Sequence, residues 1–247
     1  MTFQILQRFL QAAGLNLALS AAVFAQDCSL SPSVLIHSCQ TDLQIHLRVL
    51  PDEMQANSHH MLTVAGTYSS ADRFGVEGLV IKDGQIVSRR YQNWDGVLII
   101  NKKGMPNLFH ARDVALGGEN YNLKEKSLRD GFVAKAKRMG VAVLQSHLLI
   151  NDSRLDLEDV ADAPKFKRRM LVTMNDGSFG IWESTQAETL YDAAHQVQQE
   201  LNPKMALNLD MGAYDYCVSG PAGAQKDCGR LIVSKDKLTN LLAFTKG

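Results

Sequence analysis

Short runs of apolar residues, each closed by a turn signal, make up most of the chain. In GLVIKDGQIVSRRY and in RRMLVTMNDGSFGIW, an Asp-Gly pair (Asp83-Gly84 or Asp176-Gly177) separates two such runs. An Asp-Gly pair in that position favours a β-hairpin, because the turn needs backbone conformations with positive φ. A third hairpin is predicted for DGVLIINKKGMPNLFHA, with Gly104 and Pro106 in a longer turn. VAVLQSHLLINDSRLD predicts a further strand that turns at Asn151-Asp152.

Two segments carry apolar residues at helical spacing instead. The first starts at Thr185, which forms a capping-box pattern with Glu188, and it ends before Asn202-Pro203. The second runs from about 123 to 139 and ends at Gly140. Their predicted buried faces are Leu190, Ala194, Val197 and Leu201 in the first, and Leu128, Phe132, Ala136 and Met139 in the second. Hairpins with a few segregated helices predict an α+β fold, in which antiparallel or mixed sheets pack with the helices. Because no linker is evident, one domain is predicted over residues 26–247.

The first 25 residues differ from the rest of the chain. They hold one charge, Arg8, then a mostly apolar stretch that ends in Val23-Phe24-Ala25. Small residues at Val23 and Ala25 predict a secretory signal peptide, cleaved before Gln26. An uncleaved membrane anchor or an apolar first helix is the alternative. No other stretch approaches the ~18 apolar residues of a spanning helix, so the mature protein is expected off the membrane, periplasmic or secreted.

Charge and cysteine content narrow the kinds of partner. Lys+Arg and Asp+Glu each number 26, so no global field favours nucleic acid. The four cysteines form two local pairs, Cys28 with Cys39 and Cys217 with Cys228, each eleven positions apart. An exported protein with an even number of cysteines favours disulfides, although other pairings stay open. Neither pair has the spacing of a zinc or redox motif.

General catalytic motifs are absent from the sequence. It holds no G-x-S-x-G, P-loop, G-x-G-x-x-G or H-E-x-x-H pattern, and no cofactor is expected. The adjacent His59-His60 could suggest a metal, but no acid or cysteine lies at ligand spacing. A solvated loop is favoured there, and no metal site is predicted. His195 falls on the polar side of its predicted helix and is expected at the surface.

Polar residues gather instead at the predicted strand ends. These candidates are Thr67, Tyr68, Glu77, Gln145, His147, Arg168, Arg169, Asn208, Asp210, Tyr214 and Asp215. Each of these residues could also have a purely structural role or lie at the surface. The basic run at 165–169 follows an acidic one and could simply neutralise it, Gln145 and His147 could face solvent, and Asp210 could only cap its turn.

In their order along the chain, these segments resemble the phosphodiester glycosidase domain family. The resemblance rests on VAGTYSSADRFGVEGLVIKDGQIV, VLIINKKG, LQSHLLIND, RRMLVTMNDGSFGIWES and ALNLDMGAYDY, and it covers about Met61 to Phe244. It implies an α+β domain that hydrolyses a sugar–phosphate glycosidic bond, as in many exported bacterial homologues. The family's Asn-Gly pair is Ala65-Gly66 here, and Met211 replaces a glycine after Asp210.

The resemblance also implies roles for particular residues. Arg168 or Arg169 matches the family's arginine, whose planar guanidinium suits a phosphate. Asp210 would stabilise charge at the sugar carbon, act as nucleophile or activate water, with Glu77 as a second catalytic carboxylate. From the residues themselves, we further hypothesise that Asn208 lies on the same face as Asp210 and that Tyr214 or Tyr216 stacks on the sugar. The remaining candidates would bind substrate.

Two other functions stay open from the sequence. The altered AGTY and DMGAYD stretches would suit a glycan-binding module that retains a carbohydrate or sugar-phosphate ligand without cleaving it. A purely structural envelope protein is the third possibility. Turnover of a sugar phosphodiester favours the hydrolase, and saturable binding without turnover favours the module.

Overall fold

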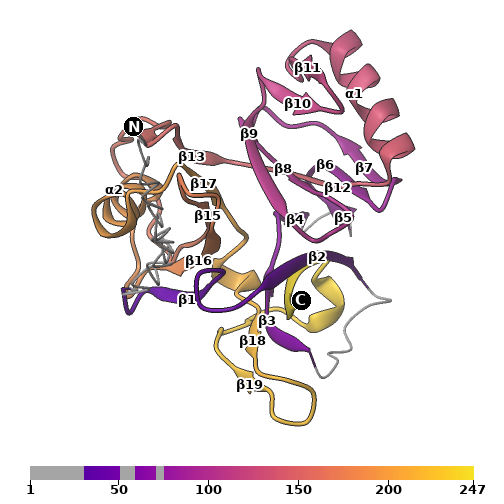
Figure 1. The fold of residues 1–247 in the computed structure, drawn as a ribbon. Helices are drawn as coiled ribbons and strands as arrows, with labels where there is room; N and C mark the ends of the chain where they lie inside the picture. The colour runs from indigo at the N-terminus through magenta and orange to yellow at the C-terminus, as the bar shows by residue number, and fades with distance from the viewer. Residues whose placement is uncertain (1–30, 51–58, 71–74) are drawn as a thin grey trace, which may run out of the picture.

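The computed structural model describes residues 31–50, 59–70 and 75–247 (Figure 1). The predicted signal peptide and Cys28 lie outside these ranges. Within them, no helix is both long enough and apolar enough to cross a membrane.

The largest sheet has six strands and carries one helix. Its strand order is β1-β16-β15-β17-β13-β14, and helix α2 (Leu190–Leu201) packs beside it (Figure 1). The strands are β1 (Val34–His37), β13 (Leu148–Asn151), β14 (Arg154–Leu155), β15 (Arg169–Thr173), β16 (Phe179–Glu183) and β17 (Met205–Asn208). Ala193, Ala194 and Val197 form the buried face of α2.

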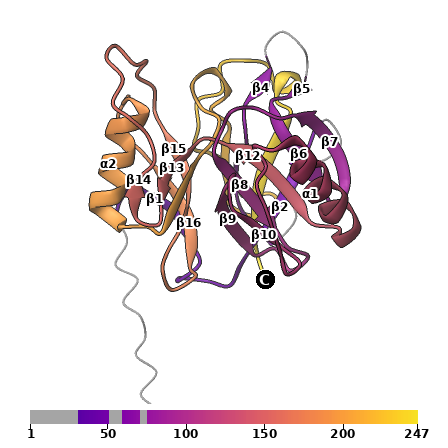
Figure 2. The same cartoon turned by 90° about the horizontal axis from the view of Figure 1, so that it is seen from above.

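A second, five-stranded sheet carries the other helix. Its order is β7-β6-β12-β8-β9, and its strands are β6 (Gly78–Lys82), β7 (Gln85–Arg90), β8 (Gly96–Ile100), β9 (Pro106–His110) and β12 (Ala142–Ser146). Helix α1 (Lys126–Met139) covers it together with a ribbon of β10 (Val114–Leu116) and β11 (Glu119–Tyr121). The two helices therefore lie on opposite flanks of the molecule (Figure 2).

The third sheet pairs the early strand β2 with the last strand, β20. Its order is β19-β18-β3-β20-β2, with β2 (Leu43–Val49), β3 (His60–Ala65), β18 (Cys217–Ser219), β19 (Lys226–Asp227) and β20 (Asn240–Lys246). A short ribbon of β4 (Ser69–Ser70) and β5 (Gly75–Val76) follows β3 in sequence. Two 3₁₀ helices, η1 (Gly212–Tyr214) and η2 (Lys235–Lys237), complete the described elements.

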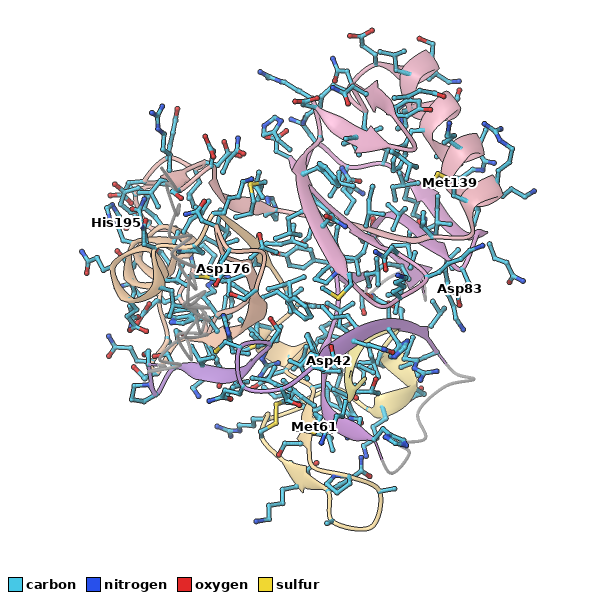
Figure 3. All side chains as sticks on the ribbon, viewed as in Figure 1. Asp42, Met61, Asp83, Met139, Asp176 and His195 are labelled. Atoms are coloured by element: carbon cyan, nitrogen blue, oxygen red, sulfur yellow. A yellow bond between two sulfur atoms is a disulfide. The ribbon has the colours of Figure 1, made fainter. Side chains whose placement is uncertain are left out.

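One apolar cluster joins all three sheets, and their side chains fill the space between them (Figure 3). It includes Ile45, Val64 and Leu242 from the third sheet, Val80, Leu98 and Leu144 from the second, and Leu171, Ile181 and Leu207 from the first. The described pairings within the sheets are antiparallel. The α+β prediction is therefore confirmed.

The three predicted hairpins form. Lys82 pairs with Gln85 across Asp83-Gly84, and both turn residues have positive φ, 48° and 80°. β15 pairs with β16 around Asp176-Gly177, and β8 pairs with β9 around Gly104. These hairpins were predictable because their signals are local.

The run predicted as one strand, VAVLQSHLLIND, forms two strands instead. β12 belongs to the second sheet and β13 to the first, with His147 between them. Gln145, Ser146 and His147 interrupt the apolar run at this point, but the pattern alone could not reveal the break, because both halves are buried, each in a different sheet. The predicted turn after Asn151 is present, with positive φ at Asp152 and Ser153.

Both helices begin later than predicted. The N-cap of α2 is Thr189, whose hydroxyl accepts a hydrogen bond from the Asp192 N–H at 3.0 Å, so the predicted cap at Thr185 is wrong. Glu188 cannot start the helix because it forms an extended bridge with Phe166. Helix α1 begins at Lys126, later than the predicted start near residue 123. It ends at Met139 with Gly140 as a left-handed C-cap, and this end agrees with the prediction.

Other predictions from the sequence can be checked in the described residues. The Cys217–Cys228 disulfide is present, whereas the Cys28–Cys39 pairing involves a residue outside the described ranges. His60 opens β3 and is buried, with its ring bonded to Thr63 and to the Gly220 carbonyl, so it does not lie in a solvated loop. His195 lies at the outer edge of α2 (Figure 3).

Candidate functional site

Four chain segments meet at strand ends on the boundary of the three sheets. The Asp210 N–H donates to the Gly66 carbonyl at 2.7 Å, which joins the end of β17 to the end of β3. The Asn208 N–H donates to the His147 carbonyl at 2.9 Å, and the Leu209 N–H donates to that of Arg169 at 2.9 Å. These bonds fix the backbone from which the predicted polar side chains project.

The Gly66-Thr67 segment is held by Asn240, at the start of β20. The Asn240 side chain donates to the Thr67 carbonyl and accepts from the Thr67 N–H, each at 2.8 Å. A Cβ atom on Gly66 would lie 2.1 Å from Asn240 Oδ1, so only glycine fits there. The Thr67 hydroxyl donates to the Gln145 backbone carbonyl at 2.7 Å. In the described structure, the Thr67 side chain therefore holds the backbone of a neighbouring strand.

Asp210 is a buried acid with an unusual proton affinity. Asp210 is 4% exposed, and its Oδ2 accepts a hydrogen bond from the Ser69 N–H at 3.0 Å. Burial raises the pKa of Asp210 to about 7, although hydrogen bonds from the Ser69 and Met211 N–H groups act in the opposite direction. A carboxyl that titrates near neutral pH is suited to proton transfer.

Tyr68 is one of three aromatic rings in mutual contact, and the charges of Asp210 and Arg168 both act on it. Its ring centroid is 5.0 Å from that of Trp94 and 5.7 Å from that of His147. Burial raises the pKa of Tyr68 to about 12, and the charge of Asp210 adds to this rise, whereas Arg168 lowers it. Tyr68 is therefore an electrostatic neighbour of both Asp210 and Arg168.

Arg168 is a buried cation without an anionic partner among the described residues. It is 8% exposed, its Nε donates to the Glu188 carbonyl at 3.0 Å, and its Nη2 donates to the Pro164 carbonyl at 2.6 Å. The guanidinium also lies over the Phe166 ring, 5.2 Å from its centroid. Burial lowers the pKa of Arg168. A bound anion would offset this desolvation, and Nη1 has no bond to a described residue.

Arg169 is engaged by the protein's own carboxylates. It is completely buried, and its guanidinium bonds both Glu183 and Asp215 and donates to the Tyr216 carbonyl at 3.1 Å. Asp215 also accepts from the Arg230 N–H at 2.9 Å. These anions already satisfy Arg169, whereas Arg168 has none among the described residues.

Gln145 and Glu77 contact neighbouring protein groups. Gln145 is fully buried, so the solvent-facing alternative is wrong, and its amide bonds the backbones of Leu79, Gln92 and Trp94. It thus fixes the loop that carries the Trp94 ring. Glu77 accepts from Gln92 Nε2 at 2.7 Å and lies 3.7 Å from Arg90, and its N–H donates to the Tyr68 carbonyl.

The aromatic rings beside Tyr68 are Trp94 and His147, not the tyrosines after Asp210. Tyr214 and Tyr216 pack with a separate apolar cluster that includes Val218. Burial lowers the pKa of His147, which favours its neutral ring. Sequence reasoning did not select Trp94, although a tryptophan in the polar loop YQNWDG was an available signal.

A second group of titratable residues lies apart from these rings. Oxygens of Asp95 and Asp156 each lie 3.9 Å from His110 Nε2, within the span that a metal would need. However, Lys124 Nζ lies 2.6 Å from Asp95, and His110 Nδ1 accepts from the Arg112 N–H. A neutral His110 therefore carries its proton on Nε2, which faces the acids as a donor and not as a metal ligand.

Comparisons with known proteins show a similarity of fold to solved structures and nothing beyond the fold. No family model and no curated protein matches the sequence. Among solved structures, the zebrafish N-acetylglucosamine-1-phosphodiester alpha-N-acetylglucosaminidase catalytic domain, auto-inhibited by its pro-peptide, aligns with a TM-score of 0.53 at 12% identity. The alignment covers 84% of this chain and 74% of that chain. A hypothetical protein from Synechocystis aligns with a TM-score of 0.53 at 11% identity, over 83% of this chain and 57% of that one.

Proposed function

We propose that this protein is a hydrolase that cleaves the glycosidic bond of a sugar 1-phosphodiester. The observation that carries the proposal is the buried Arg168, which lacks an anionic partner among the described residues. The charges of Arg168 and of the buried acid Asp210 both act on the pKa of Tyr68, in opposite directions. The fold relation to a phosphodiester glycosidase domain is consistent with this reading.

The chemistry divides between the two groups. The bond between the sugar C1 and the phosphate oxygen breaks, and a new bond forms between C1 and the oxygen of water. The water keeps one proton in the new hydroxyl and releases the other to a base or to solvent. The departing phosphomonoester carries the bonding electrons, and Arg168 neutralises that charge. Asp210, as carboxylate, activates the water or stabilises positive charge at C1. A carboxyl with a pKa of about 7 populates both protonation states at neutral pH.

The proposal includes export and a single-domain organisation. The apolar N-terminal segment supports a signal peptide over residues 1–25, and the Cys217–Cys228 disulfide fits an oxidising compartment. The residues from 26 onward would form one catalytic domain, with a periplasmic or secreted location. The apolar cluster shared by the three sheets supports a single folding unit.

Arg168→Gln tests the proposal directly. With sugar 1-phosphodiesters that differ in the sugar, including the 2-acetamido sugar, we expect wild-type turnover and a kcat/KM about 10²-fold lower in the variant, because a charged contact to phosphate is lost. Lys167→Gln is the matched control. It removes the same charge from the same segment, but its side chain is 48% exposed, so kcat/KM should change less than about twofold.

Two results would count against the hydrolase. If Arg168→Gln and Lys167→Gln behave alike in folded protein, Arg168 does not bind the phosphate. If the wild-type protein binds a sugar phosphodiester saturably without turnover, the glycan-binding module is correct instead.

A further inference from the structure

The hydroxyl of Tyr68 and the side-chain amide of Asn208 form a pair in which each partner has one unused hydrogen-bonding function. Asn208 Nδ2 donates to the Tyr68 hydroxyl oxygen at 2.6 Å and to the Leu209 carbonyl at 3.1 Å. Asn208 is 1% exposed. Its Oδ1 is buried, and no described residue donates to it.

The orientation of this amide is fixed by its surroundings. The Leu209 carbonyl accepts hydrogen bonds only, so the Asn208 atom beside it must be the nitrogen. The Tyr68 oxygen is therefore the acceptor in its bond with Asn208, and its own proton points elsewhere. Among the residues that the structure describes, no acceptor for that proton is found. One donor and one acceptor are thus left over at adjacent positions.

A buried polar atom without a partner is costly, and native proteins rarely keep one without a reason. A hydroxyl group complements both functions, because it has one proton to donate and lone pairs to accept. A carboxylate or a phosphate has no proton for Asn208 Oδ1, and an ammonium group has no lone pair for the Tyr68 proton.

We propose that Tyr68 and Asn208 together bind a hydroxyl group of the substrate sugar, on the ring carbon next to the one that reacts, and so select for sugars that carry it. This inference rests on the proposed function and deepens it. The position follows from the chain: Ser69, next to Tyr68, holds Asp210, and Asp210 is two residues from Asn208. A group bound by the pair therefore lies beside the acid. The three rings of Tyr68, Trp94 and His147 add an apolar surface against which a sugar face can pack.

The experiment compares 2-hydroxy and 2-deoxy forms of one sugar 1-phosphodiester in wild-type protein and in Tyr68→Phe. Wild-type protein is expected to prefer the 2-hydroxy substrate, because the deoxy sugar leaves both groups unpaired. In Tyr68→Phe this preference, the ratio of the two kcat/KM values, should shrink about tenfold, as expected for one lost hydrogen bond at a buried site. Comparing this ratio in the variant with the same ratio in the wild-type protein cancels the different intrinsic reactivity of the two substrates.

Tyr121→Phe provides the matched control. The Tyr121 hydroxyl bonds Glu119 at the α1 side of the second sheet, so removing it should leave the ratio unchanged. Isothermal titration with non-hydrolysable phosphonate analogues of both sugars gives a readout that does not depend on turnover, and the binding ratio should shrink in the same way.

Each outcome decides something. An unchanged ratio in Tyr68→Phe, in kinetics and in binding, overturns the inference while the hydrolase stands. If kcat falls equally for both sugars, the pair holds the attacking water and not the sugar, and the inference is also overturned. Absence of wild-type turnover together with a hydroxyl-dependent binding ratio removes the hydrolase and keeps the inference for a binding protein.

Discussion

Asp210→Asn is expected to abolish most hydrolysis of a sugar 1-phosphodiester while making the protein more stable at alkaline pH. Turnover should fall by about 10³-fold, the scale of a lost acid–base or nucleophilic group. The amide keeps an oxygen that can accept from the Ser69 and Met211 N–H groups, so the local structure should persist. Asp130→Asn, an exposed acid on α1 paired with Lys126, should leave turnover unchanged.

The gain in stability follows from the raised pKa of Asp210. Between pH 4 and pH 7 the folded protein keeps the Asp210 proton while the unfolded chain loses it, so the contribution of this group to stability falls as pH rises. A folded-state pKa of about 7 against an ordinary value of 3.8 corresponds to about 4 kcal/mol, lost by about pH 8. The amide side chain of Asp210→Asn does not ionise. The excess of its free energy of unfolding over that of the wild-type protein should therefore be largest from about pH 8 and smallest near pH 4.

Urea unfolding of both proteins at several pH values measures this difference. A variant that is inactive but shows the wild-type pH dependence of stability would mean that Asp210 is not the group with the raised pKa. A fully active variant would remove Asp210 from the mechanism.

Arg169→Met is expected to lower the free energy of unfolding by about 3–5 kcal/mol, because it leaves two buried carboxylates without their counter-ion. Glu183 and Asp215 both bond this guanidinium, and each of the two carboxylates is 10% exposed. Asp215 lies in the segment that follows Asp210, so the loss should also loosen the acid's backbone. Arg169 would thus be a positioning residue, in contrast with its neighbour Arg168.

Two comparisons isolate the ion pairs. Lys167→Met removes a half-exposed cation that lies 3.2 Å from the same Glu183, and it should cost less than about 1 kcal/mol. Adding Glu183→Gln and Asp215→Asn to Arg169→Met should recover part of the loss, because the unpaired charges are gone. If Arg169→Met unfolds in urea like the wild-type protein, the buried network does not have the role assigned to it.

The parts of the fold that were predictable are those with local signals. Asp83-Gly84 specifies its hairpin within six residues, and Gly140 and Asn202 end their helices with left-handed caps. Where pairing between distant segments determines the local structure, the sequence pattern predicts the wrong element. Glu188 lies in a capping-box pattern yet pairs with Phe166, and His147 lies in an apolar run yet separates strands of two sheets.

The candidate site shows the same division. Asp210 could be predicted as a candidate because it is an acid at the end of an apolar strand. In the structure it is buried near Tyr68 and Asn208. The sequence could not choose between Arg168 and Arg169, because adjacent residues of a strand face opposite sides and a one-residue change of register exchanges them. Nor could it show that Gln145 and Thr67 hold backbone groups, since those partners lie far away in the chain.

Hydrolysis of a sugar 1-phosphodiester in water enriched in ¹⁸O tests the central claim most directly. If Arg168 carries the phosphate as leaving group and Asp210 acts at the sugar carbon, mass spectrometry should find the label on C1 of the released sugar and none in the phosphomonoester. Label in the phosphate would mean that the phosphorus–oxygen bond breaks, and would contradict the glycosidase.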